Sequence, residues 1–231
     1  MRQVLIPLLA LLFASPLLAH DLWLEAAGSD YLLLQGHRHS GHAGAETVAY
    51  DAARVAGALC VDADGRRREL TVPAQSPVRL AGPCAVLQVS YVSGYWTKTA
   101  WETKNQPKTG LTGVLRSWHS QEAVKRIGQW SPASAKPLGV GLEITPLRDP
   151  FTVKIGDKLN LLVTDDGQPL AGVPVAYGDD TRGVSGADGQ IAIRLRHGGL
   201  QLLTASRETP LNDGKADVSL RSTSLQFEIS R

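Results

Sequence analysis

Short apolar runs separated by turn-forming clusters occupy most of the chain. Over residues 20–92 they are bounded by Gly, Asp or Pro and comprise Leu22–Leu24, Tyr31–Leu34, Arg54–Val61 and Val86–Val92. From Leu142 onward the runs return between turn signals such as Asp166-Gly167 and Asp188-Gly189. About seven short strands in roughly ninety residues is the β-sandwich pattern. The pattern predicts a mostly β protein with two β-sandwich domains, Ig-like or transthyretin-like, over residues 20–92 and 142–231.

The segment between these domains, residues 93–141, loses the alternation. It carries four of the five tryptophans, namely Trp96, Trp101, Trp118 and Trp130. We expect an irregular excursion whose aromatic side chains pack on the β scaffold, with an exposed carbohydrate platform as the alternative. One short helix is predicted from Gln121 to Gln129, with Ser120 as its N-cap and Ser131-Pro132 as its stop.

Residues 1–19 have the features of a signal peptide. Arg2 supplies a positive charge, Val4 to Ala14 is almost continuously apolar, and Ala19 offers a small residue before a cut. The apolar run is too short to span a bilayer. We therefore expect cleavage after Ala19 and a mature chain in the periplasm that begins at His20 and has no membrane insertion.

The charge balance changes this picture little. The chain has 24 Lys and Arg residues against 22 Asp and Glu residues, a formal net charge of +2. Such a balance gives no electrostatic footprint for nucleic acid. The single basic run, Arg66-Arg67-Arg68, follows Asp64-Gly65 and is interpreted as the solvated flank of a hairpin.

The two cysteines, Cys60 and Cys84, are predicted to form a disulfide. Exported proteins meet an oxidising compartment, in which a pair of this kind oxidises and persists. Their separation does not match a zinc-ligand pattern, and binding of a soft metal by the two thiols is the minor alternative.

Four of the six histidines lie close to the predicted N-terminus: His20, His37, His39 and His42. At a new N-terminus His20 offers its α-amino group and its ring Nδ1 to one ion. In an extended segment His37 and His39 point to one face, and His42 could reach the same place from a turn. Sites rich in imidazole suit Ni, Cu, Zn or Co rather than Mg or Ca. The alternative interpretation is that this segment is an ordinary solvated polar loop. In that case a histidine follows the cleavage site at position 20 only by chance.

His119 is a weaker additional ligand. It lies at the start of the predicted helix, where an ordinary capping or surface histidine is the simpler interpretation.

The N-terminal motifs His20–Glu25 and Gly36–His39 resemble those of exported bacterial proteins known as nickel- or cobalt-uptake-associated periplasmic proteins. The resemblance extends to four C-terminal segments, Ile144–Phe151, Gly156–Leu159, Gly167–Val175 and Ala187–Gln190. That C-terminal portion is also similar to the small β-sandwich that forms the regulatory-like domain of carboxypeptidases.

The resemblance implies a periplasmic protein that binds a divalent transition metal, nickel or cobalt first and copper or zinc as options. It implies a role in metal uptake or delivery, with a membrane metal transporter or receptor as a possible partner. The predicted ligands are His20, His37 and His39, with His42 and His119 as additions.

Two other classes of function are weighed against metal binding. A secreted copper mono-oxygenase-like enzyme would also use an N-terminal histidine brace. The fuller nitrogen set predicted here leaves less open coordination, which favours holding an ion over catalysis, so no enzymatic activity is predicted. A module that binds a protein or glycan through the Trp-rich segment is the third class, and its stability would not respond to metal.

Overall fold

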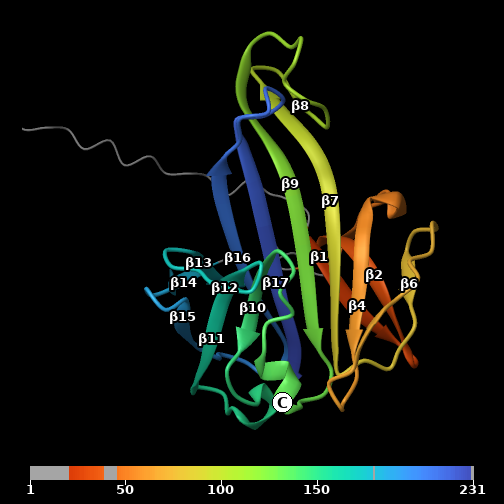
Figure 1. Ribbon diagram of the computed structural model, residues 1–231, viewed down its shortest axis with the longest axis vertical. Helices are drawn as coiled ribbons and strands as arrows, with labels where there is room; N and C mark the ends of the chain where they lie inside the picture. The colour runs from red at the N-terminus through yellow and green to blue at the C-terminus, as the bar shows by residue number, and fades with distance from the viewer. Residues whose placement is uncertain (1–20, 39–45, 179, 230–231) are drawn as a thin grey trace, which may run out of the picture.

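The computed structural model describes residues 21–38, 46–178 and 180–229, apart from the side chains of His37 and Glu46. Over these residues the chain folds into three β-sheets with three short 3-10 helices (Figure 1). The mostly β class predicted from the sequence is therefore confirmed. The 3-10 helices are η1 (Ala52–Arg54), η2 (Pro132–Ala135) and η3 (Pro150–Thr152).

A sheet of nine described strands forms the centre of the molecule. Its order is β14-β13-β16-β17-β9-β7-β4-β5, with β8 paired to β7. Neighbouring strands are antiparallel except β17 and β9, which are parallel. Figure 1 shows β7, β9, β16 and β17 projecting beyond the rest of the fold at one end. The strands are β4 (Val55–Val61), β5 (Arg67–Glu69), β7 (Val86–Thr99), β8 (Thr103–Lys104), β9 (Val114–Ile127), β13 (Pro174–Tyr177), β14 (Asp180–Val184), β16 (Gly199–Pro210) and β17 (Val218–Ile229).

The short helix predicted from Gln121 to Gln129 is wrong. Residues up to Ile127 belong to strand β9, which is hydrogen-bonded to β17 on one side and to β7 on the other. Both faces of this strand are covered, since Val124 belongs to one hydrophobic core and Ile127 to another. Pairing and burial of this kind override the helix propensity of the Ala, Glu, Lys and Arg residues in the segment.

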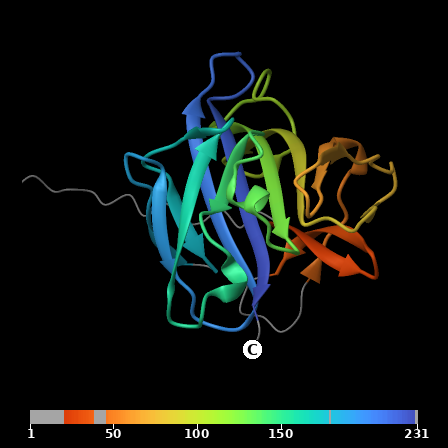
Figure 2. The ribbon, with the colours of Figure 1, turned by 60° about the horizontal axis from the view of Figure 1, so that its bottom comes forward.

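Two four-stranded sheets flank the central sheet (Figures 1 and 2). In the N-terminal sheet the order is β1-β2-β3, and β6 also pairs with β2. In the C-terminal sheet the order is β10-β11-β12, and β15 also pairs with β11. Their strands are β1 (Asp21–Ala27), β2 (Asp30–His37), β3 (Glu46–Thr47), β6 (Val78–Leu80), β10 (Leu142–Pro146), β11 (Lys158–Asp165), β12 (Gln168–Pro169) and β15 (Gln190–Arg194).

Each flanking sheet shares a hydrophobic core with the central sheet. The N-terminal core joins Leu24 of β1 to Leu87 of β7, and the C-terminal core joins Leu161 of β11 to Val86 of β7. Val86 and Leu87 are neighbours in one strand, so their side chains point to opposite faces of the central sheet. The central sheet thus takes strands from both predicted β domains and from the segment between them, and holds all three regions together.

The predicted disulfide between Cys60 and Cys84 is present, with the two Cα atoms 5.4 Å apart. Cys60 lies in β4, Cys84 lies two residues before β7, and both are buried in the N-terminal core. The bond closes a loop that contains β5 and β6. It joins the end of this loop, at Cys84, to β4 of the central sheet.

Candidate functional site

The structure describes part of the predicted histidine site. His20, His39 and His42 lie outside the described residues. His37 is the last residue of β2, and its backbone pairs with that of Glu46. His119 lies in β9.

The pairing of β1 with β2 determines where two of these histidines are attached. Asp21, the first residue of β1, pairs with Gly36 of β2. His20 precedes Asp21 in the sequence, and His37 follows Gly36. Paired residues of antiparallel strands lie about 4.5–5.5 Å apart at Cα, and one further residue adds about 3.8 Å. Two of the predicted ligands are therefore joined to a single paired position, at the same end of the N-terminal sheet.

Hydrogen bonds to the central sheet hold the outer edge of β1. The Leu24 amide donates to Gln226 Oε1 over 2.9 Å, and Arg126 Nη1 donates to the Leu24 carbonyl over 3.4 Å. Gln226 lies in β17 and Arg126 in β9. These bonds fix the middle of β1 beside the last residues of β9 and β17, two neighbouring strands of the central sheet.

A carboxylate of the central sheet lies close to this end of β1. The pKa of Glu122, in β9, is raised to about 7, first by burial and then by the negative charge of Asp21, against opposing hydrogen bonds from Ser93 and Ser120. Burial and the charge of Asp21 both oppose ionisation of Glu122, and a cation bound beside Glu122 would favour its charged form. The sequence analysis did not identify Glu122, because it placed the residue in a helix. Local periodicity gives no signal for it, because Ser120 and Glu122 interrupt the apolar residues Trp118 and Val124 on the same face of the strand.

His119 lies on the other face of β9 from Glu122. Glu122 lies three positions after His119, an odd number of steps along a strand, so the two side chains point in opposite directions. The ring centroid of His119 is 4.6 Å from that of Tyr95, whose hydroxyl donates to Asp213 Oδ2 over 2.7 Å. The structure therefore does not bring His119 together with Glu122 and the start of β1.

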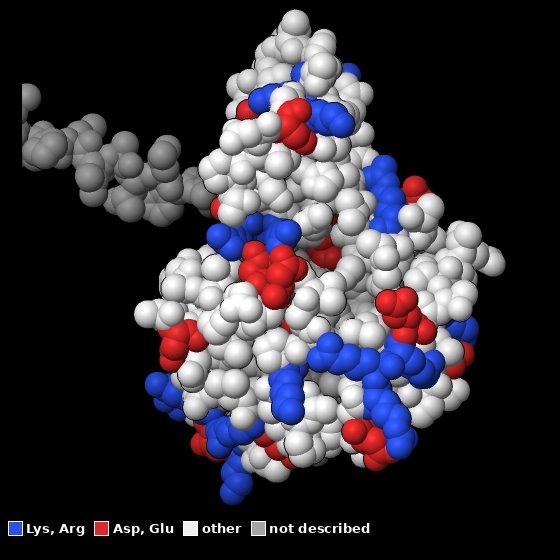
Figure 3. All heavy atoms as spheres, in the orientation of Figure 1, with Lys and Arg blue, Asp and Glu red and all other residues white. Residues whose placement is uncertain are grey.

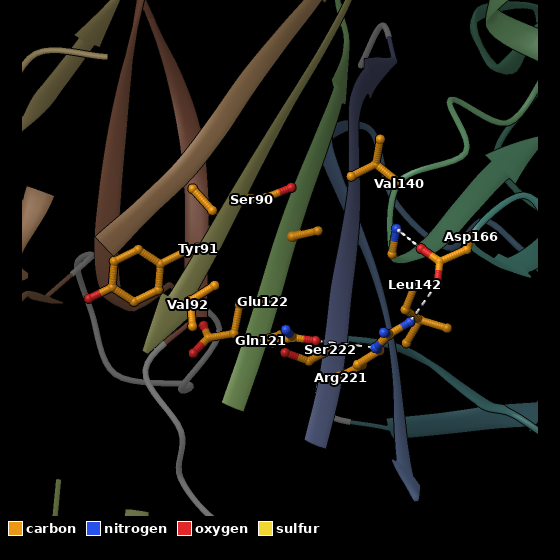
Figure 4. Close-up of a pocket in the computed structure, with 13 residues that line it drawn as sticks. Ser90, Tyr91, Val92, Gln121, Glu122, Val140, Leu142, Asp166, Arg221 and Ser222 are labelled. Atoms are coloured by element: carbon orange, nitrogen blue, oxygen red, sulfur yellow. Dashed lines mark hydrogen bonds and ion pairs between the residues drawn. The ribbon is translucent and has the colours of Figure 1, made fainter. Parts of the chain in front are cut away.

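A hollow of about 220 Å³ lies beside this region, and Glu122 is one of the residues that line it (Figure 4). The lining comes from β4, β7, β9, β10 and β17 and from the loops at positions 140–141 and 166. Arg221 Nε donates to Gln121 Oε1 over 3.2 Å, and Arg221 Nη1 donates to Asp166 Oδ2 over 3.1 Å. The guanidinium also pairs with Asp165, so its charge is balanced and attracts a bound anion only weakly. We assign no ligand to this hollow.

The charged side chains of the surface are mixed in sign. Basic and acidic residues are interspersed over the face drawn in Figure 3. Several form ion pairs, such as Lys108 with Asp217 at 2.5 Å and Arg207 with Asp165 at 3.0 Å. This face carries opposite charges side by side, as the near-neutral net charge would suggest.

Within the part of the chain that the structure describes, no three His, Cys, Asp or Glu side chains are grouped so that they could hold a metal ion. Near the start of β1 the described donors are the carboxylates of Asp21 and Glu122. A transition-metal site at this end of β1 therefore requires the nitrogen donors predicted from the sequence on either side of the β1–β2 pair.

The geometry defines a mostly β protein with flanking sheets on a long central sheet and a carboxylate pair at the start of its first strand. Residues 17–209 match the family model described as "Domain of unknown function (DUF4198)", and the chain belongs to that family. No curated protein matches the chain. Among residues 21–38, 46–178 and 180–229, no helix has the length and apolar character needed to cross a membrane.

Proposed function

We propose that this protein binds a divalent transition metal in the periplasm, nickel or cobalt first and copper or zinc as alternatives, for uptake or delivery. The mature N-terminus supplies the α-amino group and the ring Nδ1 of His20, and His37 and His39 supply two further nitrogens. His42 and His119 are additional ligands of lower rank. A membrane metal transporter or receptor is the partner that this role requires.

The observation that carries the proposal is the pairing of Asp21 with Gly36. It joins the residue after His20 to the residue before His37, so the two donor segments start from neighbouring backbone positions. Ligands attached to an ordered sheet lose less freedom on binding than ligands in an open loop. The pairing thus supports one shared site rather than two separate surface histidines.

The carboxylates of Asp21 and Glu122 favour a cation at the same place. The charged form of Glu122 is disfavoured first by burial and then by the negative charge of Asp21. A divalent ion bound to the histidine nitrogens would lie within the field of both carboxylates. His119 lies on the opposite face of β9, so of the five histidines it receives the least support.

The rest of the proposal derives from resemblance. The signal peptide of residues 1–19 and the periplasmic location agree with the N-terminal motifs of the nickel- and cobalt-associated proteins. We also propose that residues 142–231 form the carboxypeptidase-regulatory-like β-sandwich. In support, β10, β11 and β15 pack on β13, β16 and β17 across the C-terminal core.

Calorimetric titration of Ni²⁺, Co²⁺, Cu²⁺ and Zn²⁺ into the mature protein tests this function. We expect His37→Ala/His39→Ala to abolish binding and the metal-dependent rise in melting temperature, and one extra residue before His20 to weaken binding. Since the donors must be unprotonated, affinity should fall as pH drops from about 7 to 5.

His197→Ala is the matched control, because its ring stacks on Tyr177 in the C-terminal region. His119→Ala separates the ligand of lowest support from the rest. A double variant that binds all four ions as tightly as the parent would show the proposal to be wrong.

A further inference from the structure

Arg38 stands between two predicted ligands in the sequence, and its side chain is held on the N-terminal sheet. The guanidinium carbon lies 5.6 Å from the centroid of the Trp23 ring, in a cation–π arrangement. Its Nη1 also forms an ion pair with Glu25 Oε1. The side chain of Arg38 is 26% exposed, so it lies along the sheet instead of extending into solvent.

Trp23 and Glu25 together bind this guanidinium. Both lie in β1, two residues apart, and therefore on one face of the strand. Trp23 Nε1 donates to Glu25 Oε1 over 3.1 Å, which orients the carboxylate toward the indole. The Trp23 side chain is fully buried, so surrounding atoms hold the indole in place.

The contact spans the end of the sheet where the predicted site lies. Asp21 pairs with Gly36, Trp23 with Leu34, and Arg38 follows two residues after Gly36. Arg38 thus reaches back from the position just after β2 to side chains of β1. A charge-assisted hydrogen bond and a cation–π contact on a desolvated ring together exceed the worth of an ordinary exposed ion pair.

We propose that Arg38 is a positioning residue that orders the segment carrying His37 beside the start of β1 before any metal binds. The inference rests on the proposed metal-binding function. Ordering the backbone in advance removes an entropic cost from binding, so the contact raises affinity without supplying a ligand. A guanidinium offers hydrogen-bond donors only, so Arg38 itself does not coordinate the ion.

The first experiment needs no metal. Trypsin cleaves after arginine only when the residue can leave its contacts, so cleavage of the Arg38–His39 bond reports whether the guanidinium is held. We expect Glu25→Gln to speed this cleavage about 5-fold or more in the native mature protein, by removal of the ionic contact. Asp30→Asn is the matched control, because it breaks the 3.0 Å ion pair between Arg79 and Asp30 at the other end of the same strands.

The second experiment measures Ni²⁺ affinity by calorimetry. We expect Arg38→Gln to raise Kd about 10-fold, with the melting temperature of the metal-free protein within about 2 °C of the parent. Arg38→Lys, which keeps the cation, should recover most of the affinity, and Arg79→Gln should bind like the parent. If Arg38→Gln does not fold, Glu25→Gln serves in its place.

The outcomes of these experiments separate the positioning role of Arg38 from the proposed metal-binding function. Unchanged cleavage after Arg38 in Glu25→Gln would overturn the inference directly. Faster cleavage with an unchanged Kd in Arg38→Gln would overturn it as well and leave the metal-binding function intact. A parent protein that binds none of Ni²⁺, Co²⁺, Cu²⁺ and Zn²⁺ would overturn the proposed function and this inference with it.

Discussion

Two ionisable side chains on β9, Glu122 and Lys125, lie on opposite faces of the strand and meet different surroundings. Glu122 faces the start of β1, where burial and the carboxylate of Asp21 raise its pKa. Lys125 faces the C-terminal sheet, where Lys125 Nζ donates to Glu143 Oε1 over 2.6 Å. One is a carboxylate beside a like charge, and the other is half of a buried ion pair, so they affect stability in opposite ways.

Glu122 is expected to make the protein less stable as pH rises. Its folded-state pKa, about 7, lies above the ordinary value of 4.5, so the folded state binds more protons than the unfolded state between these values. The free energy of unfolding should therefore fall through this window, by roughly 1–3 kcal/mol. Urea unfolding of metal-free Glu122→Gln should lack this fall and show greater stability than the parent at pH 8. The exposed Glu102→Gln should behave as the parent, and parallel pH profiles for Glu122→Gln and the parent would contradict the assignment.

Loss of Lys125 is expected to be severe. The side chains of Lys125 and Glu143 are 1% and 0% exposed, and Glu143 also accepts hydrogen bonds from the amides of Leu138 and Gly139. Lys125→Met leaves the carboxylate charge buried and should cost about 3–5 kcal/mol in urea unfolding. A Lys125→Met/Glu143→Gln double variant should recover part of this loss, because an amide oxygen still serves the two backbone donors. Asp64→Asn, from a solvent-exposed pair with Arg66, should cost less than about 1 kcal/mol.

At the scale of the element, β9 is a strand that the sequence pattern did not predict. Strands with one buried face and one more exposed face, such as β2, were predicted from their apolar runs. β9 is covered on both faces and carries buried polar residues, so its pattern of apolar residues is interrupted. The partners that make those residues tolerable, Glu143 for Lys125 among them, lie in other elements that local periodicity does not reveal. The parallel pairing of β9 with β17, more than ninety residues apart, has no local signal either.

The turns were predicted more successfully, because their chemistry is local. Gly167 and Gly189, in the Asp-Gly turn signals, have φ of 80° and 75°. This is the left-handed region, which glycine enters without the steric penalty that a Cβ brings. Hairpin positions of this kind depend on two or three neighbouring residues and can be found from the sequence alone.

Gly189→Ala is expected to destabilise the C-terminal region by roughly 2–4 kcal/mol. A Cβ at this position would lie 2.7 Å from the carbonyl oxygen of Val163, and the residue would keep its left-handed φ. Gly172→Ala is the matched control, since its φ is 77° and nothing lies within 4 Å of the added Cβ. The control should cost about 1 kcal/mol, and equal losses for both variants in urea unfolding would show that the close contact has no effect.

On the scale of the whole molecule, the central sheet unites the three regions distinguished in the sequence. β4 and β7 start from the first region, β9 comes from the middle, and β13, β14, β16 and β17 come from the last. The class of fold and the disulfide were predicted from the sequence. The disulfide was predictable because the chain has two cysteines, which can pair with each other. The sequence did not predict that the middle region would supply the strand at the centre, nor that Glu122 would reach the start of β1.

The disulfide is expected to stabilise the whole fold through the unfolded state. Cys60 and Cys84 are 24 residues apart in sequence, and closing a loop of this length contributes about 3 kcal/mol. Cys60→Ala/Cys84→Ala should lose roughly this amount in urea unfolding and keep the far-ultraviolet spectrum of a β protein. Two free thiols in the exported protein under non-reducing conditions would contradict the pairing.

The mature protein is expected to begin at His20. The segment before the cut carries the features of a signal peptide, and β1 begins one residue after His20 with Asp21 paired to Gly36. A start at this residue would place the new α-amino group one residue from Asp21, whose charge acts on Glu122. The amine has an ordinary pKa of about 7.7–8.0, so it loses its proton to a metal near neutral pH, which an internal amide does not. Mass-spectrometric mapping of the N-terminal peptide of the exported protein should therefore find His20 as its first residue. Replacing Ala19 with a bulky residue should shift or block the cut, and the resulting species should bind Ni²⁺ more weakly than the parent. A parent that starts at another residue would remove the amine from the ligand set and leave only the ring nitrogens of the histidines.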